Sequence, residues 1–171
     1  MLEKARRAND SVEEDTGAAF KIAMRDMAGT VAIISTELDG ERHGMAATSV
    51  VSLSMDPPSV LFCVNRSASI HEPLTQRGLA SINILSEQQA PLCKIFSGGE
   101  KGGDRFDHGD WITGPEGLPC LTDAMETLIV RAEQQFVYGT HGVFSGEILQ
   151  VLPNGGIKPL VYLNGNFLKS S

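Results

Sequence analysis

The feature that most constrains the fold is a succession of short apolar, β-branched segments, each bounded by glycine or proline. The run TVAIIST at 30–36 is followed by the turn Leu38-Asp39-Gly40-Glu41, and Asp56-Pro57-Pro58 breaks a later pair. Such runs between turn signals predict strands, here at 30–36, 47–53, 59–64, 79–85, 128–135, 137–151 and 160–163. Short helices are expected at 70–77, ended by Gly78, and at 87–96. We therefore expect a mainly β fold with short helices (α+β), built as a closed or split β-barrel.

The N-terminal region is expected to contain one more helix. Phe20, Ala23, Met24 and Met27 follow helical spacing, with Thr16 as a candidate N-cap. We expect the Met and Phe face of this helix to pack on the core. Residues 1–15 are polar and mixed in charge, which indicates a flexible N-terminal arm. The chain of 171 residues suits a single domain, over 16–171, with no repeat and no interdomain linker.

Charge and composition exclude several classes of function. The net charge of −7 argues against nucleic acid as a partner, but allows a small anionic ligand in a local basic pocket. No histidine has a metal-ligand partner at a convincing spacing, and the three cysteines follow no zinc-like pattern, so no metal site is expected. The charged N-terminus resembles no signal peptide, and the longest apolar run, 60–64, is too short to cross a membrane. These features predict a cytoplasmic protein with reduced thiols.

The stretch HGMAATSVVSLSMDPPSVLFCVNRSAS, starting at His43, is rich in small and hydroxyl residues. It is either a turn-rich patch of an ordinary β domain or a backbone shaped for close approach of a flat, polar ligand. Its end, 65–69, precedes a helix and provides either an anion site or simple capping groups. The later loop FSGGEKGGDRF matches neither a P-loop nor a dinucleotide-binding glycine pattern. Lys101 and Arg105 in that loop are candidates to meet a ligand phosphate.

Taken in order, these motifs resemble the flavin reductase family. The resemblance rests on MAGTVAIIST, the stretch after His43, SINILS, FSGG…DRF, GTHGVFSGEI and PLVYLNGNF, and covers residues 20–167. It implies an FMN-binding split barrel that acts as a homodimer. It also implies hydride transfer from NADH or NADPH to FMN or FAD, which supplies reduced flavin to a monooxygenase component.

The resemblance also implies roles for individual residues. His141 matches the histidine of the family's Gly-Asp-His motif and would position the nicotinamide. Three segments would surround the flavin: one lining the isoalloxazine ring, one passing the ribityl chain and phosphate, and one closing the other side. In that order they contain Ala46, Ala47, Thr48, Ser49, Val50 and Ser52; then Cys63, Val64, Asn65, Arg66, Ser67 and Ser69; then Phe96, Ser97 and Gly98, with Lys101 or Arg105.

Three departures from the family pattern keep other functions open. Thr140 replaces the motif's Asp, Thr48 stands where Asn is common, and Ala28-Gly29-Thr30 replaces Ala-Thr-Gly. The first alternative is a flavin-dependent cob(II)yrinic acid a,c-diamide reductase, which would pass electrons to a corrinoid acceptor. The second is a non-enzymatic module that binds flavin or haem. Free flavin reduction, a bound-flavin corrinoid reaction and simple binding would each give a different assay result.

Overall fold

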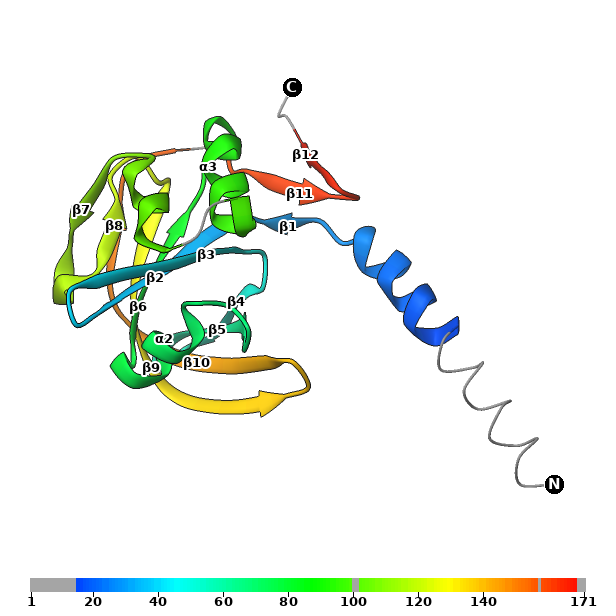
Figure 1. The fold of residues 1–171 in the computed structure, drawn as a ribbon, viewed down its shortest axis with the longest axis horizontal. Helices are drawn as coiled ribbons and strands as arrows, with labels where there is room; N and C mark the ends of the chain where they lie inside the picture. The colour runs from blue at the N-terminus through cyan, green and yellow to red at the C-terminus, as the bar shows by residue number, and fades with distance from the viewer. Residues whose placement is uncertain (1–14, 100–101, 157, 169–171) are drawn as a thin grey trace.

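The computed structural model describes residues 15–99, 102–156 and 158–168. It consists mainly of strands, with a few short helices and helical turns between them (Figure 1). The strands are β1 (Gly29–Thr30), β2 (Ala32–Leu38), β3 (Glu41–Ala47), β4 (Val50–Met55), β5 (Pro58–Asn65), β6 (Leu79–Ile84), β7 (Trp111–Thr113), β8 (Pro119–Leu121), β9 (Glu126–Tyr138), β10 (His141–Pro153), β11 (Val161–Leu163) and β12 (Asn166–Leu168). The helices and helical turns are α2 (His71–Arg77), η1 (Glu87–Gln89), α3 (Ala90–Lys94), η2 (Ile95–Gly99), η3 (Gly102–Asp107) and η4 (Pro115–Gly117).

A seven-stranded antiparallel sheet in the order β3-β2-β6-β9-β10-β5-β4 forms the body. Its two edge strands, β3 and β4, are separated along the chain by Thr48 and Ser49 alone. Because two residues span only a few ångströms, the sheet must curl until its edges approach each other. No ladder joins those edges among the described strands. The predicted mainly β, split-barrel fold is confirmed.

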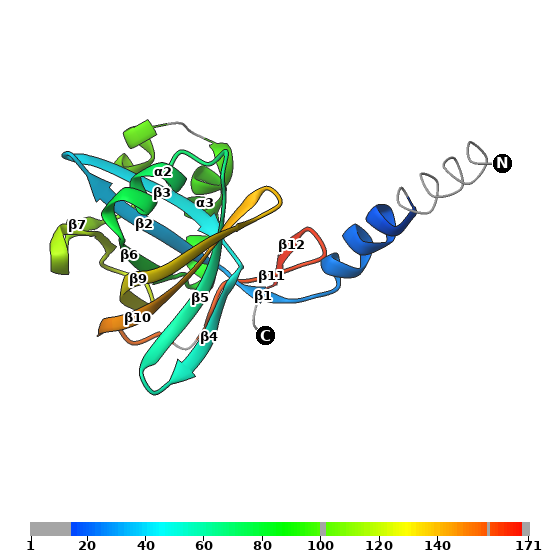
Figure 2. The same ribbon diagram turned by 90° about the horizontal axis from the view of Figure 1, so that it is seen from below.

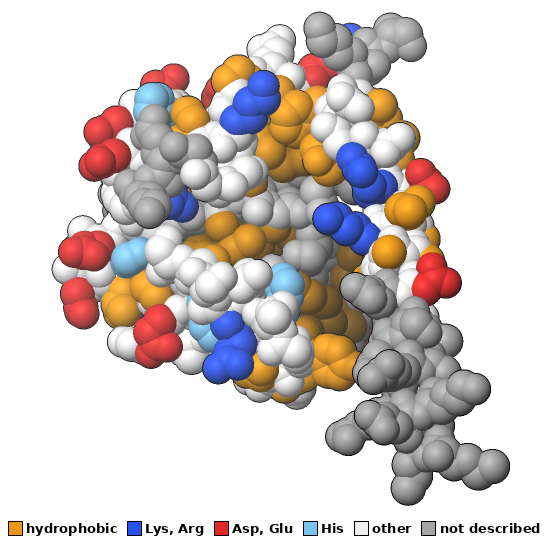
Figure 3. All heavy atoms as spheres, turned by 45° about the vertical axis from the view of Figure 1, so that its right-hand side comes forward, with side chains coloured by type: hydrophobic (Ala, Val, Ile, Leu, Met, Phe, Trp, Pro, Cys, Tyr) orange, Lys and Arg blue, Asp and Glu red, His pale blue; other side chains and the backbone are white. Residues whose placement is uncertain are grey.

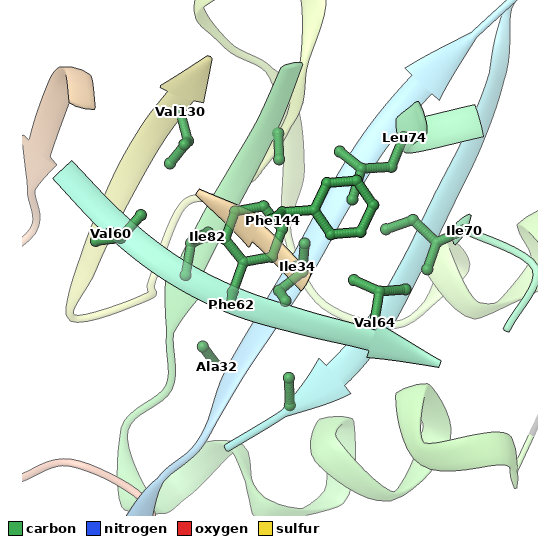
Figure 4. Close-up of a cluster of buried hydrophobic side chains, with 12 residues drawn as sticks. Ala32, Ile34, Val60, Phe62, Val64, Ile70, Leu74, Ile82, Val130 and Phe144 are labelled. Atoms are coloured by element: carbon green, nitrogen blue, oxygen red, sulfur yellow. The ribbon is translucent and has the colours of Figure 1, made fainter. Parts of the chain in front are cut away.

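The interior of the barrel is filled by the inward-facing side chains of alternate strand residues. Every second residue of β5 is buried from Val60 onward, as expected for a strand with one face on a core. Phe62 on β5 and Phe144 on β10 are register partners, and their rings stack with centroids 5.4 Å apart and planes 9° apart. Figure 4 shows aliphatic side chains around this pair, among them Ile34 and Ile82. This core fixes the relative positions of β5 and β10.

A second cluster packs outside the barrel, against β3. The rings of Phe96, Phe106 and Trp111 contact one another at centroid distances of 4.9–5.4 Å. Gly44 on β3 lies directly beneath them: a Cβ there would be 2.8 Å from Cε1 of Phe96. The absent side chain lets η2 and η3 lie flat on β3, which places residues 96–98 and 105 beside it.

The strand predicted at 47–53 begins too early: the chain turns at 48–49, and β4 starts at Val50. The strand before that turn, β3, was not expected, since its sequence ERHGMAA shows no apolar alternation. Ala47 faces the barrel core, whereas Gly44 faces the ring cluster on the other side. The two-residue turn between β11 and β12 was also missed. Its Asn164-Gly165 pair, with φ of 48° and 82°, is a strong hairpin signal.

The N-terminal helix, described over residues 15–25, points away from the barrel (Figures 1 and 2). The expectation that its Met and Phe face packs on the core is wrong: Phe20 and Met27 are both 63 % exposed. The helix meets the body at one backbone hydrogen bond, from Asn164 N–H to the Arg25 carbonyl, at 2.8 Å. The predicted arm, 1–15, lies outside the described residues except for Asp15. In the described segments, no helix has the length and apolar character needed to cross a membrane.

Candidate functional site

Two neighbouring hollows lie where the end of β3 meets α3, η2 and the β11–β12 hairpin. The larger has a volume of about 430 Å³ and the smaller about 320 Å³. Ala46 and Ser97 line both, so the two form one continuous trench. Figure 3 shows a hollow on this side of the molecule, with hydrophobic side chains on its floor and Lys and Arg side chains at its rim.

The larger hollow is bounded by small residues on one side. Ala46, Ala47 and Thr48 end β3 there, and Val31 lies beside them. A Cβ on Gly29 would be 3.0 Å from the Thr48 Cβ, so β1 and the β3 end pack closely. The opposite sides are formed by Cys93, Lys94 and Ser97 and by the hairpin residues Tyr162, Gly165 and Phe167. The small side chains of 46–48 therefore form one part of the lining, and larger side chains form the rest.

The smaller hollow holds the site's buried cation. Arg105 is only 7 % exposed, and its Nη1 donates a hydrogen bond to the Gly44 carbonyl. Its guanidinium also lies over the Phe96 ring, 5.8 Å from the centroid. The Gly44 carbonyl and the Phe96 ring offset part of the cost of burying this charge, and they hold the guanidinium in the wall of the hollow. Ser69 and Gly98 line the same hollow and add polar groups.

The loop after β5 is organised by Asn65. Its Oδ1 accepts hydrogen bonds from the Ser67 N–H and the Ser67 Oγ, both at 2.9 Å. Ser49 in the turn after β3 donates its hydroxyl to the Cys63 carbonyl at 3.0 Å. These bonds tie the 48–49 turn and the 65–69 loop to β5. The two segments that the family resemblance assigns to the flavin are therefore held together by one strand.

His141 begins β10 beside that loop. It is the register partner of Asn65, and the Arg66 N–H donates to the Thr140 carbonyl at 2.9 Å. The Thr140 hydroxyl lies 3.0 Å from Nδ1 of His141. The threonine that replaces the family's aspartate thus still contacts the imidazole. Gly142 is required next to it, since a Cβ there would be 2.6 Å from Nε2 of His71.

The structure gathers part of the expected set around the trench. The lining residues among those expected are Ala46, Ala47, Thr48, Ser69, Phe96, Ser97, Gly98 and Arg105. Val50 and Ser52 on β4, and Cys63 on β5, lie outside its lining, and the Val64 side chain points into the core (Figure 4). Lys101 lies outside the described residues.

Sequence reasoning missed several lining residues. Cys93 and Lys94 were assigned only to a helix, and the hairpin residues Tyr162, Gly165 and Phe167 only to a family motif. The Asn164-Gly165 turn could have indicated the hairpin, but not that it folds back onto the end of β3. Burial raises the pKa of the Cys93 thiol, which a hydrogen bond with Ser97 partly offsets. Cys93 therefore contributes a neutral, apolar group to the wall. Across the described ranges, no three His, Cys, Asp or Glu side chains gather as metal ligands would.

The sequence pattern of the family described as "Flavin reductase like domain" matches residues 24–171, and the chain belongs to that family. The reductase component of the FADH(2)-dependent resorcinol hydroxylase of Rhizobium sp. (strain MTP-10005) is 33 % identical over 165 residues, covering 95 % of this chain and 92 % of the relative. The FMN reductase (NADH) RutF of Pseudomonas syringae pv. syringae is 34 % identical over 149 residues, covering 87 % and 84 %.

The fold agrees with that of a solved reductase complex. The NADH:FAD oxidoreductase SgcE6 of Streptomyces globisporus C-1027, in complex with NAD and FAD fragments, superimposes with a TM-score of 0.82 at 26 % identity. The match covers 89 % of this chain and 91 % of that one. The predicted family and split-barrel fold are thereby confirmed from both sequence and structure.

Proposed function

We propose that the protein is an NADH-dependent flavin reductase that supplies reduced flavin to a monooxygenase component. The single observation that carries this is the trench, in a chain of this family: the small residues Ala46, Ala47 and Thr48 line one end, and the buried Arg105 lines the other. The relatives named above use NADH, FMN and FAD, which supports the same choice of substrates. Its three free thiols and its use of a reduced nicotinamide favour action in the cytoplasm.

The donor set of the trench fits a flavin. Arg105 and the Ser69 hydroxyl would hold the ribityl phosphate, as a charged and a neutral donor at one end. The peptide groups of Ala46–Thr48 would meet the polar edge of the ring system, and their small side chains keep that edge within reach. When bound, the flavin accepts a hydride; the chain's residues bind it, orient it and shield it from water.

His141 would orient the nicotinamide. It lies on the strand next to β5, opposite Asn65, where the 65–69 loop begins. The contact between its Nδ1 and the Thr140 hydroxyl fixes the plane of the imidazole. Hydride transfer itself requires no proton from this side chain. We therefore assign His141 to binding and alignment of the nicotinamide carboxamide rather than to proton transfer.

An absorbance assay at 340 nm separates this function from the two alternatives. Purified protein should oxidise NADH when free FMN or FAD is added, with turnover that depends on flavin concentration. A corrinoid reductase would instead retain tightly bound flavin and respond to a cob(II)alamin-type acceptor. A binding module would take up flavin without oxidising NADH. Absence of flavin-dependent NADH oxidation would contradict the proposal.

We also propose that the protein is a homodimer. The edge strand β4 exposes Val51, Leu53 and Met55, the last of them 82 % exposed, and the end of β9 exposes Phe136 and Tyr138. An unpaired edge strand with apolar side chains is unfavourable in a monomer and is typical of a subunit interface. Light scattering after gel filtration should give twice the chain mass of 18.3 kDa. Leu53→Lys should shift the mass toward the monomer, and a monomeric wild type would contradict the dimer.

A further inference from the structure

The hairpin formed by β11 and β12 supplies a wall of the larger hollow that the family resemblance assigned to no ligand. Tyr162, Gly165 and Phe167 face that hollow. The other side of the hollow is the small-residue end of β3. An aromatic side chain in the lining of a cavity offers a flat apolar surface against which a ring can pack.

The hairpin lies beside the end of β3 because β1 runs between them. Tyr162 is the ladder partner of Gly29, and neighbouring strands lie about 4.8 Å apart. On its other side, Gly29 packs against Thr48, where a Cβ would be 3.0 Å from the Thr48 Cβ. Thr48, Gly29 and Tyr162 therefore lie side by side. A larger residue at Gly29 would push these walls apart, which explains a glycine at this point of the strand.

The ring of Tyr162 is held by its neighbour and is still accessible. Phe167 contacts it edge-to-face, with centroids 5.6 Å apart and planes at 64°. Phe167 is itself anchored, because it packs against the second core cluster with Phe96 and Trp111. Tyr162 remains 41 % exposed in spite of that contact. The contact with Phe167 thus holds the Tyr162 ring in place, and part of the ring surface stays free to contact a ligand.

Resting on the proposed function, we propose that Tyr162 packs its ring against the isoalloxazine system of the bound flavin, with Phe167 as the positioning residue behind it. Tyr162 then contributes to binding of the ring and not of the phosphate, which Arg105 holds at the other end of the trench. The contribution is therefore the same for FMN and for riboflavin, which lacks the phosphate. A role in binding the phosphate, or in binding the nicotinamide alone, would not have this signature.

The test is a titration of FMN and of riboflavin into wild type, Tyr162→Ala, Tyr162→Phe and Leu168→Ala. Tyr162→Ala should raise the Kd of both flavins by roughly tenfold, the value of a good aromatic contact. Tyr162→Phe keeps the ring and should stay within about twofold of wild type. Leu168 is exposed on the same hairpin, pairs with Val161 and lies outside the hollow's lining, so Leu168→Ala is the matched control.

Flavin fluorescence gives a second readout, which a purely structural role would not change. A tyrosine in contact with the isoalloxazine quenches its emission by donating an electron to the excited ring, whereas phenylalanine does not. Bound flavin should therefore be brighter in Tyr162→Phe than in wild type, although the affinity is kept. Equal quenching in these two proteins would overturn the proposal.

Other outcomes would also overturn it. They are an unchanged flavin affinity in Tyr162→Ala, a change confined to the NADH KM, and a changed molecular mass that places Tyr162 in a subunit interface. Should Tyr162→Ala fail to fold, the Phe variant still decides through fluorescence. Failure of the proposed function is distinct, because wild type itself would then bind no flavin or oxidise no NADH.

Discussion

His141 on β10 stands directly opposite Asn65 on β5 in the antiparallel ladder. These two residues are far apart in the chain, yet the register makes the histidine a neighbour of the loop that Asn65 organises. The Arg66 N–H donates to the Thr140 carbonyl and so fixes the turn before β10 to the same loop. The ladder thus places the residue expected to meet the nicotinamide next to the loop expected to meet the flavin.

His141→Ala should therefore raise the KM for NADH by about 2- to 10-fold, the loss of one ordinary hydrogen bond. The Kd for FMN should change by less than about twofold, since the 65–69 loop keeps its own bonds to Asn65. Steady-state rates at saturating FMN measure the first quantity and fluorescence titration the second. Thr140→Val, which removes the contact to Nδ1, should give a smaller rise. Wild-type NADH kinetics in His141→Ala would remove the role given to this residue.

Replacing Arg105 should weaken the binding of FMN, which carries a phosphate, and leave the binding of riboflavin, which carries none, nearly unchanged. Arg105→Gln should weaken FMN by about 10- to 150-fold, the range for a hydrogen bond with a charged partner. Riboflavin should bind within about twofold of wild type, because no phosphate is lost to that ligand. Parallel titrations of the two ligands provide the measurement. Equal weakening of both would show that Arg105 acts only by holding Gly44.

Gly44→Ala tests the contact that brings the glycine-rich loop onto β3. The added methyl group would be 2.8 Å from Phe96 and 3.1 Å from Phe106, two rings fixed in a buried cluster. Overpacking of this kind should lower the free energy of unfolding by about 1–3 kcal/mol in urea titrations. At Gly103 a Cβ meets nothing within 4 Å, so Gly103→Ala serves as the control. A Gly44→Ala protein as stable as the control would mean that the ring pair yields easily.

The two buried thiols should make the free energy of unfolding fall at alkaline pH. Burial raises the pKa of Cys93 and of Cys120 above the ordinary value of 9.0. The folded state then holds these protons more tightly than the unfolded chain does. Their contribution to stability is complete below pH 9 and is lost as the pH rises further.

A double variant, Cys93→Ala with Cys120→Ala, isolates that contribution. Urea unfolding between pH 7 and pH 10.5 or so should show a flatter decline for the double variant than for wild type. The same protonation should leave both thiols slow to react with iodoacetamide at neutral pH, with half-buried Cys63 reacting first. Parallel pH profiles for the two proteins would contradict this assignment.

Much of the fold could be predicted because most strands carry their own signal. Runs such as 59–64 and 128–135 alternate or are β-branched, and each became part of a strand, β5 and β9. The strand β3 could not be recognised, since both of its faces are covered and both carry small residues. Ala47 faces the barrel core and Gly44 faces the ring cluster on the other side, so no apolar alternation results. A residue as small as Gly44 is needed there because the rings of Phe96 and Phe106 pack on it, and only the tertiary structure shows that contact. The helix with Phe20 gave the opposite error: its apolar spacing predicted a face packed on the core, but that face is exposed. Periodicity identifies an apolar face and does not say what that face contacts.

The site divides in the same way. The order of its motifs was enough to indicate the family, the barrel and one side of the trench, because the segments at 46–48 and 96–98 carry local signatures of small residues and glycine. Only the folded chain showed that Val64 turns inward, that Arg105 is a buried cation, and that Tyr162 lies beside Gly29. Those facts depend on strand register and on contacts between segments that are far apart in the chain, and local sequence does not encode the distance between such segments.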